Sequence, residues 1–311
     1  MGLNAWRSLA KDVELMVEDD GGDPGRLGAC IRQLARSCDL LLGPYSTQLM
    51  WAAGPAVAET GALLWNHGAA GDDVQAAWPG RVVSVLTPTS RYTAPLLLRL
   101  ADQVVRAPLW IAEGRGSFGK QVAAGAQKLA LMLGLHVERL GAEDVLPSVE
   151  SPEPWDLLCA GSFKEDVAMV KHARSLAWRP RILCAIAAGV SEFGAAVANP
   201  EGVYGIAQWL PGHVTAPVIG PAEADFLAAY SRLSSETPDY TAVQAAAAAV
   251  LATHCAELAG SVEPGTLWET AARLDTRTLF GDFRIDPISG VQSKHETVLV
   301  RWTPDRLAAA D

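Results

Sequence analysis

Short apolar runs alternate with helical periods along most of this chain, and this alternation constrains the fold more than any other feature. We interpret the runs as strands at residues 13–17, 40–42, 63–65, 82–86, 109–112, 136–140, 156–160, 182–186 and 203–209. Strands separated by helices indicate parallel βαβ units with right-handed crossovers. The sequence therefore predicts an α/β protein whose parallel sheets are flanked by helices.

The strand series divides into two parts, which predicts two lobes of similar plan. A chain of 311 residues is long enough for two domains. We expect the lobes to be joined near Ala107-Pro108. After Pro211 the pattern changes to helices at 222–233, 241–259 and 266–274, and a last strand is expected at 296–302.

Composition and charge argue against several functional classes. Half of the residues are hydrophobic and 19% are charged, which is typical of an ordered globular protein. The net charge of −10 would repel a phosphate backbone, so we expect no nucleic-acid partner. No apolar run reaches the roughly 18 residues that span a bilayer, so we expect no membrane insertion.

Cysteines and histidines are dispersed in the sequence and suggest no metal site. The five cysteines lack a CxxC spacing and fall mostly on apolar faces; they are Cys30, Cys38, Cys159, Cys184 and Cys255. Buried free thiols are the simplest interpretation. We expect no metal and no cofactor.

Two strand-to-helix junctions near the start carry capping residues. Asp23-Pro24 supplies an N-cap and a first-turn proline for one helix. After the strand at 40–42, Gly43-Pro44 ends the strand, and Ser46 and Thr47 fall where the next helix must begin. Hydroxyls and amides at a helix N-terminus, at the carboxyl end of a parallel strand, form an anion site.

A series of segments resembles one known family in order and spacing. The segments are VELMVEDDGGDP, LLLGPYST, GALLWNHGAAGDDV, SFGKQVAAGAQKLA, GVYGIAQWLP and GDFRIDPISGVQSKHETVLVRW. Together they resemble the leucine/isoleucine/valine-binding family, the type I periplasmic solute-binding proteins of ABC importers. The resemblance implies two Rossmann-like lobes joined by a three-crossing hinge. It assigns residues 1–107 plus 211–293 to the N-terminal lobe and 108–210 plus 294–311 to the C-terminal lobe.

The resemblance also carries expectations about the start of the chain and its location. It places MGLNAWRSLAKD at the end of the family's first helix, so we expect the first strand and its ligand loop to be absent. The family implies a periplasmic or cell-surface location. No signal peptide precedes Met1 in the sequence as given, and a cytoplasmic location stays open.

In the first lobe the resemblance places ligand contacts in two loops. Tyr45, Ser46 and Thr47 match the loop that binds the ligand carboxylate; alternatively, both hydroxyls are only helix caps. The loop that follows Asn66 has small residues whose backbone lets a ligand approach closely, or it is a plain turn. Its candidate contacts are His67, Gly68, Ala69 and Ala70. His67 stands where the family commonly has proline, so a structural histidine is the competing interpretation.

In the second lobe the candidates are mostly aromatic. Phe118 matches a family tyrosine that closes over the ligand, and Phe163 and Trp209 follow strands where packing is the competing interpretation. Ala187 or Ala188 stands where amino-acid binders of the family have a glutamate that pairs with the ligand ammonium. An ammonium without that partner would be desolvated and unpaired. We therefore expect a carboxylate or amide ligand with an apolar or aromatic body.

Two alternative functions remain open from the sequence. Gly114 to Gly119 reads GRGSFG, a GxGxxG between a strand and a helix with Glu138 about 20 residues on, as in a nicotinamide-dependent enzyme; Glu113 argues against it. No catalytic motif is present, so we expect a binding protein rather than an enzyme. We expect a solute-binding protein with an ABC permease partner; the alternative is a ligand sensor of the same fold acting through a protein partner.

Overall fold

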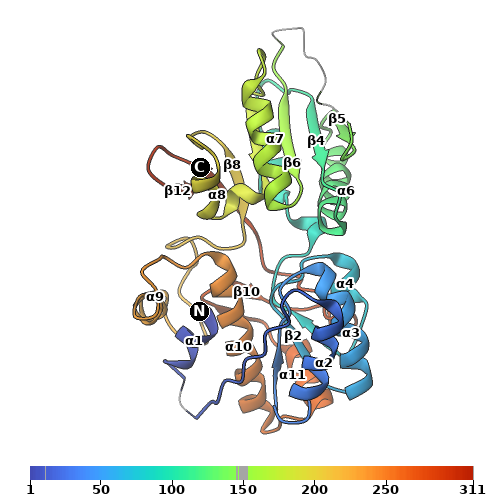
Figure 1. Cartoon of the computed structure of the whole chain (residues 1–311), viewed down its shortest axis with the longest axis vertical. Helices are drawn as coiled ribbons and strands as arrows, with labels where there is room; N and C mark the ends of the chain where they lie inside the picture. The colour runs from blue at the N-terminus through green and yellow to red at the C-terminus, as the bar shows by residue number, and fades with distance from the viewer. Residues whose placement is uncertain (11, 145, 147–152, 311) are drawn as a thin grey trace. The chain divides into compact units, whose positions relative to one another are not determined.

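The computed structural model describes residues 1–10, 12–144, 146 and 153–310. It contains two compact units (Figure 1). Unit 1 comprises Met1–Pro88 and Pro211–Glu296, and unit 2 comprises Thr89–Leu210 and Thr297–Asp311, so the chain crosses between them three times. The first crossing follows Pro88, not the expected Ala107, because α5 (Ala94–Ala101) and η1 (Thr89–Arg91) pack against α6 (Ser117–Met132) of unit 2.

Unit 1 is built on a parallel sheet of order β1-β2-β3 in its described residues. The strands are β1 (Leu41–Leu42), β2 (Leu64–Asn66) and β3 (Val82–Ser84). The helices are α1 (Gly2–Arg7), α2 (Pro24–Leu34), α3 (Thr47–Thr60), α4 (Asp72–Ala76), α9 (Glu223–Ser231), α10 (Tyr240–Ala259) and α11 (Pro264–Arg273). Asp23 caps α2 through a hydrogen bond from the Arg26 amide, as its position before Pro24 predicts.

The predicted strand at residues 13–17 is wrong. This segment is extended but pairs with no other strand in the described part of the chain. It lies against the region after α2, where the Cys38 thiol contacts the Met16 sulfur, and Val17 is exposed. The apolar run is present, but a strand also needs a neighbour for its backbone hydrogen bonds.

Helix α10 is the one described helix whose length and hydropathy would suit a membrane span. It is a core helix of unit 1: 61% of the span-like window is buried, and it packs against α1, α11 and β2. Its small side chains allow these neighbours to approach closely. The Gly2 position, for example, leaves no room for a Cβ beside the Ala242 carbonyl.

Unit 2 contains a seven-stranded sheet of order β12-β11-β8-β7-β6-β4-β5 in its described residues. The strands are β4 (Leu109–Glu113), β5 (Val137–Leu140), β6 (Asp156–Ala160), β7 (Ile182–Ala185), β8 (Tyr204–Ala207), β11 (Val298–Trp302) and β12 (Leu307–Ala309). From β8 to β5 they run parallel, whereas β11 is antiparallel to both of its neighbours. Helix α6 packs on β4 and β5, and α7 (Phe163–Ser175) packs on β6 and β7.

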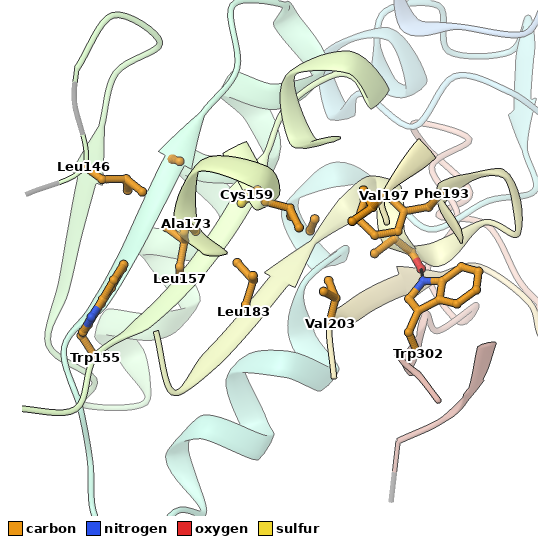
Figure 2. Packing of buried hydrophobic residues seen from close by; sticks show 14 residues of the cluster. Leu146, Trp155, Leu157, Cys159, Ala173, Leu183, Phe193, Val197, Val203 and Trp302 are labelled. Atoms are coloured by element: carbon orange, nitrogen blue, oxygen red, sulfur yellow. Dashed lines mark hydrogen bonds between the residues drawn. The ribbon is translucent and has the colours of Figure 1, made fainter. Parts of the chain in front are cut away.

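The core on the α7 side of this sheet follows the two-residue period of the strands. Leu157 and Cys159 of β6 belong to the core cluster on the α7 side (Figure 2), whereas Leu158 between them is buried but does not belong to that cluster. Phe193 from α8 (Glu192–Ala196) packs against Trp302 with ring centroids 6.3 Å apart. All five cysteines lie in the described residues and are free thiols, and Cys159, Cys184 and Cys255 are buried.

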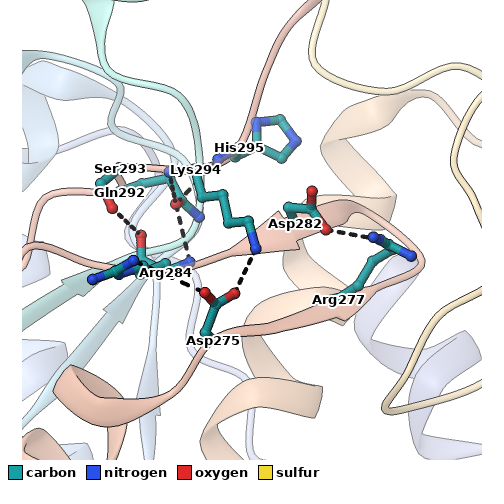
Figure 3. A network of polar contacts seen from close by, with 8 residues as sticks. All are labelled: Asp275, Arg277, Asp282, Arg284, Gln292, Ser293, Lys294 and His295. Atoms are coloured by element: carbon teal, nitrogen blue, oxygen red, sulfur yellow. Dashed lines mark hydrogen bonds and ion pairs between the residues drawn. The ribbon is translucent and has the colours of Figure 1, made fainter.

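A polar network anchors the segment by which the chain leaves unit 1 for the last time (Figure 3). The buried Gln292 side chain accepts hydrogen bonds from the amides of Arg284, Lys294 and His295, and donates to the Val85 carbonyl. Around it, β9 (Thr276–Thr278) and β10 (Gly281–Phe283) form an antiparallel pair. The Gln292 side chain thus holds together two segments that are far apart in the sequence.

Replacing Phe193 by alanine tests the core of unit 2. We expect the free energy of unfolding of this unit to fall by about 3–5 kcal/mol, because the ring is fully buried and its loss leaves a cavity. Urea unfolding followed by circular dichroism measures the change. The control Trp178→Ala removes a ring that is 46% exposed and should cost less than about 1 kcal/mol. Equal costs for both variants would contradict this core assignment.

Replacing Gln292 by alanine tests the anchoring network. The variant removes the side-chain acceptor of the buried His295 amide and of the partly buried Arg284 and Lys294 amides, so we expect unit 1 to lose at least about 2 kcal/mol of stability. In the matched control, Lys294→Ala removes an exposed ion pair to Asp275 and should cost less than about 1 kcal/mol. A larger loss in Lys294→Ala than in Gln292→Ala would show that the ion pair, not the amide, holds the segment.

Candidate ligand-binding site

In unit 1 two loops follow the carboxyl ends of β1 and β2. Ser46 is the N-cap of α3 and accepts a hydrogen bond from the Leu49 amide at 3.1 Å, which confirms the expected capping role. Thr47, the first residue of α3, is only 6% exposed, and its Oγ1 accepts a hydrogen bond from the Gly71 amide at 3.3 Å. The Thr47 hydroxyl therefore joins the first loop to the second.

The second loop is organised by Asn66, the last residue of β2. Its buried side chain accepts hydrogen bonds from the amides of Gly68 and Ala69 and donates to the Ala69 carbonyl and to the Ser84 hydroxyl. Asn66 thus fixes the conformation of the predicted contact loop and ties it to β3. Ala69 and Ala70 are 0% and 5% exposed, and the amide and carbonyl of Ala69 are already bonded to the Asn66 side chain, so Ala69 presents neither group to a ligand.

Gly68 lets the two loops touch. A Cβ at this position would lie 2.5 Å from the Tyr45 Cα, which no side chain could accommodate. Tyr45 itself is half-exposed, and its hydroxyl lies beside Tyr240, whose proximity raises the pKa of the Tyr45 phenol. The phenol therefore remains neutral and able to donate a hydrogen bond at physiological pH.

His67 is a partly buried, neutral imidazole. Burial lowers the pKa of His67 to about 4, so the ring carries no charge at pH 7. Its Nδ1 atom is buried and has no hydrogen-bond partner in the described part of the protein. The ring lies near Gly43, within 4.0 Å of a Cβ built there. This placement gives the loop a neutral hydrogen-bonding group rather than a cation.

The aromatic candidates of unit 2 differ in how much of each ring is accessible. Phe118 is partly exposed and packs edge-on against Tyr92, with ring centroids 5.8 Å apart. Phe163 is also partly exposed and packs against the core cluster on the α7 side. Trp209 is 2% exposed, and its indole Nε1 has no hydrogen-bond partner among the described residues.

The loop after β7 forms a short 3-10 helix, η2 (Ile186–Gly189). Ala188 is completely buried, and its carbonyl accepts a hydrogen bond from the Trp302 indole at 3.0 Å. Ala187 is partly exposed, so it is the alanine of this pair whose side chain has access to solvent. No carboxylate occupies either position; the nearest acid in the hydrogen-bond network is the buried Asp166, which accepts from the Ala187 amide.

Packing explains two glycines of the GxGxxG pattern, Gly114 and Gly119, whereas a Cβ built at Gly116 would have nothing within 4 Å. A Cβ at Gly114 would lie 2.5 Å from the Gly161 Cα, because the loops after β4 and β6 touch there. The amide of Arg115 donates to the Glu165 carboxylate at 3.0 Å, and Glu113 pairs with Arg139. The Arg115 amide, which a nucleotide phosphate would need, is therefore already bonded to a carboxylate, and this disfavours a dinucleotide site.

Three residues of these loops escaped prediction. Asn66 ends a predicted strand, and its position before His-Gly was the only signal that it organises a turn. Asp166 and Trp302 gave no local signal, since their roles depend on which strand ends become neighbours. Among the described residues no group of three or more histidine, cysteine or acidic side chains could hold a metal ion.

Comparison with known proteins agrees with this architecture. A family model described as periplasmic binding protein matches residues 7–306. A substrate-binding protein of an ABC transporter from Desulfitobacterium hafniense, solved in complex with Leu, superposes with a TM-score of 0.82 at 16% identity, over 99% of this chain and 94% of that one.

Two further solved structures are similar. The leucine-binding protein LivK of Thermotoga maritima gives a TM-score of 0.81 at 14% identity, over 100% of this chain and 91% of that one. An R. palustris solute-binding protein in complex with 4-hydroxybenzoate gives 0.78 at 16% identity, over 100% and 89%. Likeness at these identities shows the fold, and the family match spans nearly the whole chain. The chain therefore belongs to the periplasmic binding protein family, whose type I fold and binding rather than enzymatic character the sequence predicted.

Proposed function

We propose that this protein is the solute-binding component of an ABC importer that captures a small carboxylate or amide with an apolar or aromatic body. In this proposal the loops of unit 1 bind the polar end of the ligand, and the loops of unit 2 close over its apolar body by hinge motion at the three crossings. The family supports a role in solute binding; the ligand class comes from the residues of the loops.

The hydroxyl of Thr47 carries the proposal. It uses an oxygen lone pair to accept from Gly71, which leaves its proton to donate to a ligand oxygen. Thr47 also begins the 14-residue helix α3, whose N-terminus favours negative charge. The neutral groups of His67 and Tyr45 add hydrogen-bonding capacity without adding a charge.

The loops of unit 2 support an apolar body without an ammonium group. Phe118 and Phe163 are partly exposed, and Ala187 offers no charge to a cation. An ammonium buried without a carboxylate partner costs several kcal/mol. Among the similar proteins, one was solved with 4-hydroxybenzoate, which has a carboxylate and a ring, and another with Leu. The absence of a carboxylate at residues 187 and 188 favours the first ligand type.

A role in import implies a permease partner and a location outside the cytoplasmic membrane. We infer both from the family and not from the geometry of the site.

Replacing Thr47 by alanine tests the polar half of the site. We expect the dissociation constant of a carboxylate ligand to rise about five- to tenfold, the loss typical of one hydrogen bond, whereas Thr47→Ser should retain most of the affinity. Isothermal titration calorimetry measures both variants. Thr60→Ala is the matched control, because Thr60 lies at the far end of the same helix and bonds only within it. Unchanged affinity in Thr47→Ala would place the site elsewhere.

A pair of ligands that differ only in the ammonium group tests the apolar half. L-leucine is 4-methylpentanoate with an added amino group, so a site without an ammonium partner should prefer 4-methylpentanoate. We expect a larger rise of Tm with 4-methylpentanoate than with leucine in a thermal-shift assay, and likewise a larger rise with 3-(4-hydroxyphenyl)propanoate than with L-tyrosine. A consistent preference for the amino acids would show that another group binds the ammonium.

A further inference from the structure

A buried carboxylate lies behind the loops of unit 2. Asp166 is in the first turns of α7, after the N-cap Ser162, and is only 1% exposed. Its Oδ1 accepts a hydrogen bond from the Gly161 amide at 2.8 Å, and its Oδ2 accepts one from the Ala187 amide at 2.9 Å. One side chain therefore ties the end of β6 to the start of η2.

Both attachment points lie at or near candidate ligand contacts of unit 2. Gly161 precedes Phe163 by two residues, and Ala187 is the partly exposed residue of η2. On its other side η2 is held by the Trp302 indole, which donates to the Ala188 carbonyl, and by packing against β8. Asp166 and Trp302 thus bond the backbone of two adjacent residues of the same short loop, Ala187 and Ala188.

Asp166 is also positioned to exchange protons. It lines a cavity of about 300 Å³ in unit 2. Burial raises the pKa of Asp166 to about 7, although the hydrogen bonds from Ala187 and Gly161 act in the opposite direction. The other titratable or charged groups that line this cavity or face the carboxylate from its neighbouring elements are Glu113, Arg115, Asp144, Cys159, Glu165, His172 and Cys184.

Of these groups, few compete with Asp166 near neutral pH. Glu165 accepts hydrogen bonds from the Arg115 and Ser162 amides, which lower the pKa of its carboxyl, so it stays ionised. Burial raises the pKa of the Cys159 and Cys184 thiols, so both stay neutral. His172 lines the same cavity, so an experiment must also change this residue.

We propose that Asp166 is a positioning residue of the ligand site: its ionised carboxylate holds the loops after β6 and β7 in their binding arrangement, and protonation loosens the attachment between these two loops and weakens ligand binding. The link to ligand binding rests on the function proposed above, whereas the attachment of the loops does not. A protonated oxygen is a poorer acceptor, so the proton weakens one of the two amide hydrogen bonds.

The sign of the effect on stability follows from the raised pKa. Between about pH 4, where an unfolded aspartate titrates, and about pH 7, the folded protein binds the proton and the unfolded chain does not. The stabilisation from this proton is complete below about pH 4 and is lost as the pH rises through 7. The loops thus reach their binding arrangement above about pH 7, where the proton on Asp166 no longer stabilises the folded protein.

The first experiment needs no ligand. The indole N–H of Trp302, labelled with nitrogen-15 and assigned with Trp302→Phe, reports on η2 through its bond to Ala188. We expect its NMR resonance to titrate with a midpoint near pH 7 in the wild type, His172→Gln and Asp305→Asn, and to lose this titration in Asp166→Asn. Asp305 is an exposed aspartate of the same unit and serves as the matched control.

Two results would show that Asp166 does not control the pH response of η2. One is a titration that persists in Asp166→Asn, and the other is its loss in His172→Gln. If Asp166→Asn does not fold, the wild type and His172→Gln still decide, because a midpoint near 7 in both assigns the proton to a group other than the histidine.

Calorimetry with 4-methylpentanoate and 4-hydroxybenzoate from pH 5.5 to 8.5 then tests the link to binding. We expect affinity to rise on the order of tenfold above pH 7 in the wild type, the size of a buried hydrogen bond, and to become independent of pH in Asp166→Asn. If the Trp302 indole resonance titrates but the affinity for the probes does not change with pH, the link between Asp166 and ligand binding is wrong. If neither probe binds while the indole titrates, the proposed ligand class is wrong and the attachment stands.

Discussion

Parallel strands end at one edge of their sheet, and the loops that leave this edge must satisfy their own backbone groups. In unit 1 this task falls to Asn66, which bonds the amides of Gly68 and Ala69. In unit 2 it falls to Asp166, which bonds the amides of Gly161 and Ala187. Each unit therefore uses one buried polar side chain to order the loops on which its candidate contacts lie.

The two solutions differ in charge, and the difference has consequences. The amide of Asn66 offers both donors and an acceptor, so it can bond amides, a carbonyl and the Ser84 hydroxyl without ionising. A carboxylate offers only acceptors and must be desolvated, which is why the pKa of Asp166 rises to about 7. The loops of unit 1 are consequently insensitive to the proton on their organising residue, while those of unit 2 depend on it.

The sequence predicted most strands because their apolar runs are bounded by turn residues and caps. Residues 156–160 match β6 in full, and Ser46 caps α3 as expected. The segment at 13–17 has the apolar run of a strand but no strand partner among the described residues, and a local pattern cannot show whether a partner exists. The role of Asp166 could not be predicted for the same reason. An acid in the first turn of a helix is usually solvated, whereas here η2 lies against it and donates a hydrogen bond to it.

The proposed ligand class rests on a difference between the candidate loops of unit 1 and those of unit 2. The contact loops of unit 1 are rich in neutral donors and include a helix N-terminus, whereas the solvent-accessible candidates of unit 2 are two phenylalanines and an alanine. The carboxylate that reaches η2, that of Asp166, is 1% exposed and accepts hydrogen bonds from two amides. A carboxylate used to position a loop is not available to pair with an ammonium, and this supports the proposal that the ligand lacks that group, unlike the Leu bound in one of the similar solved structures.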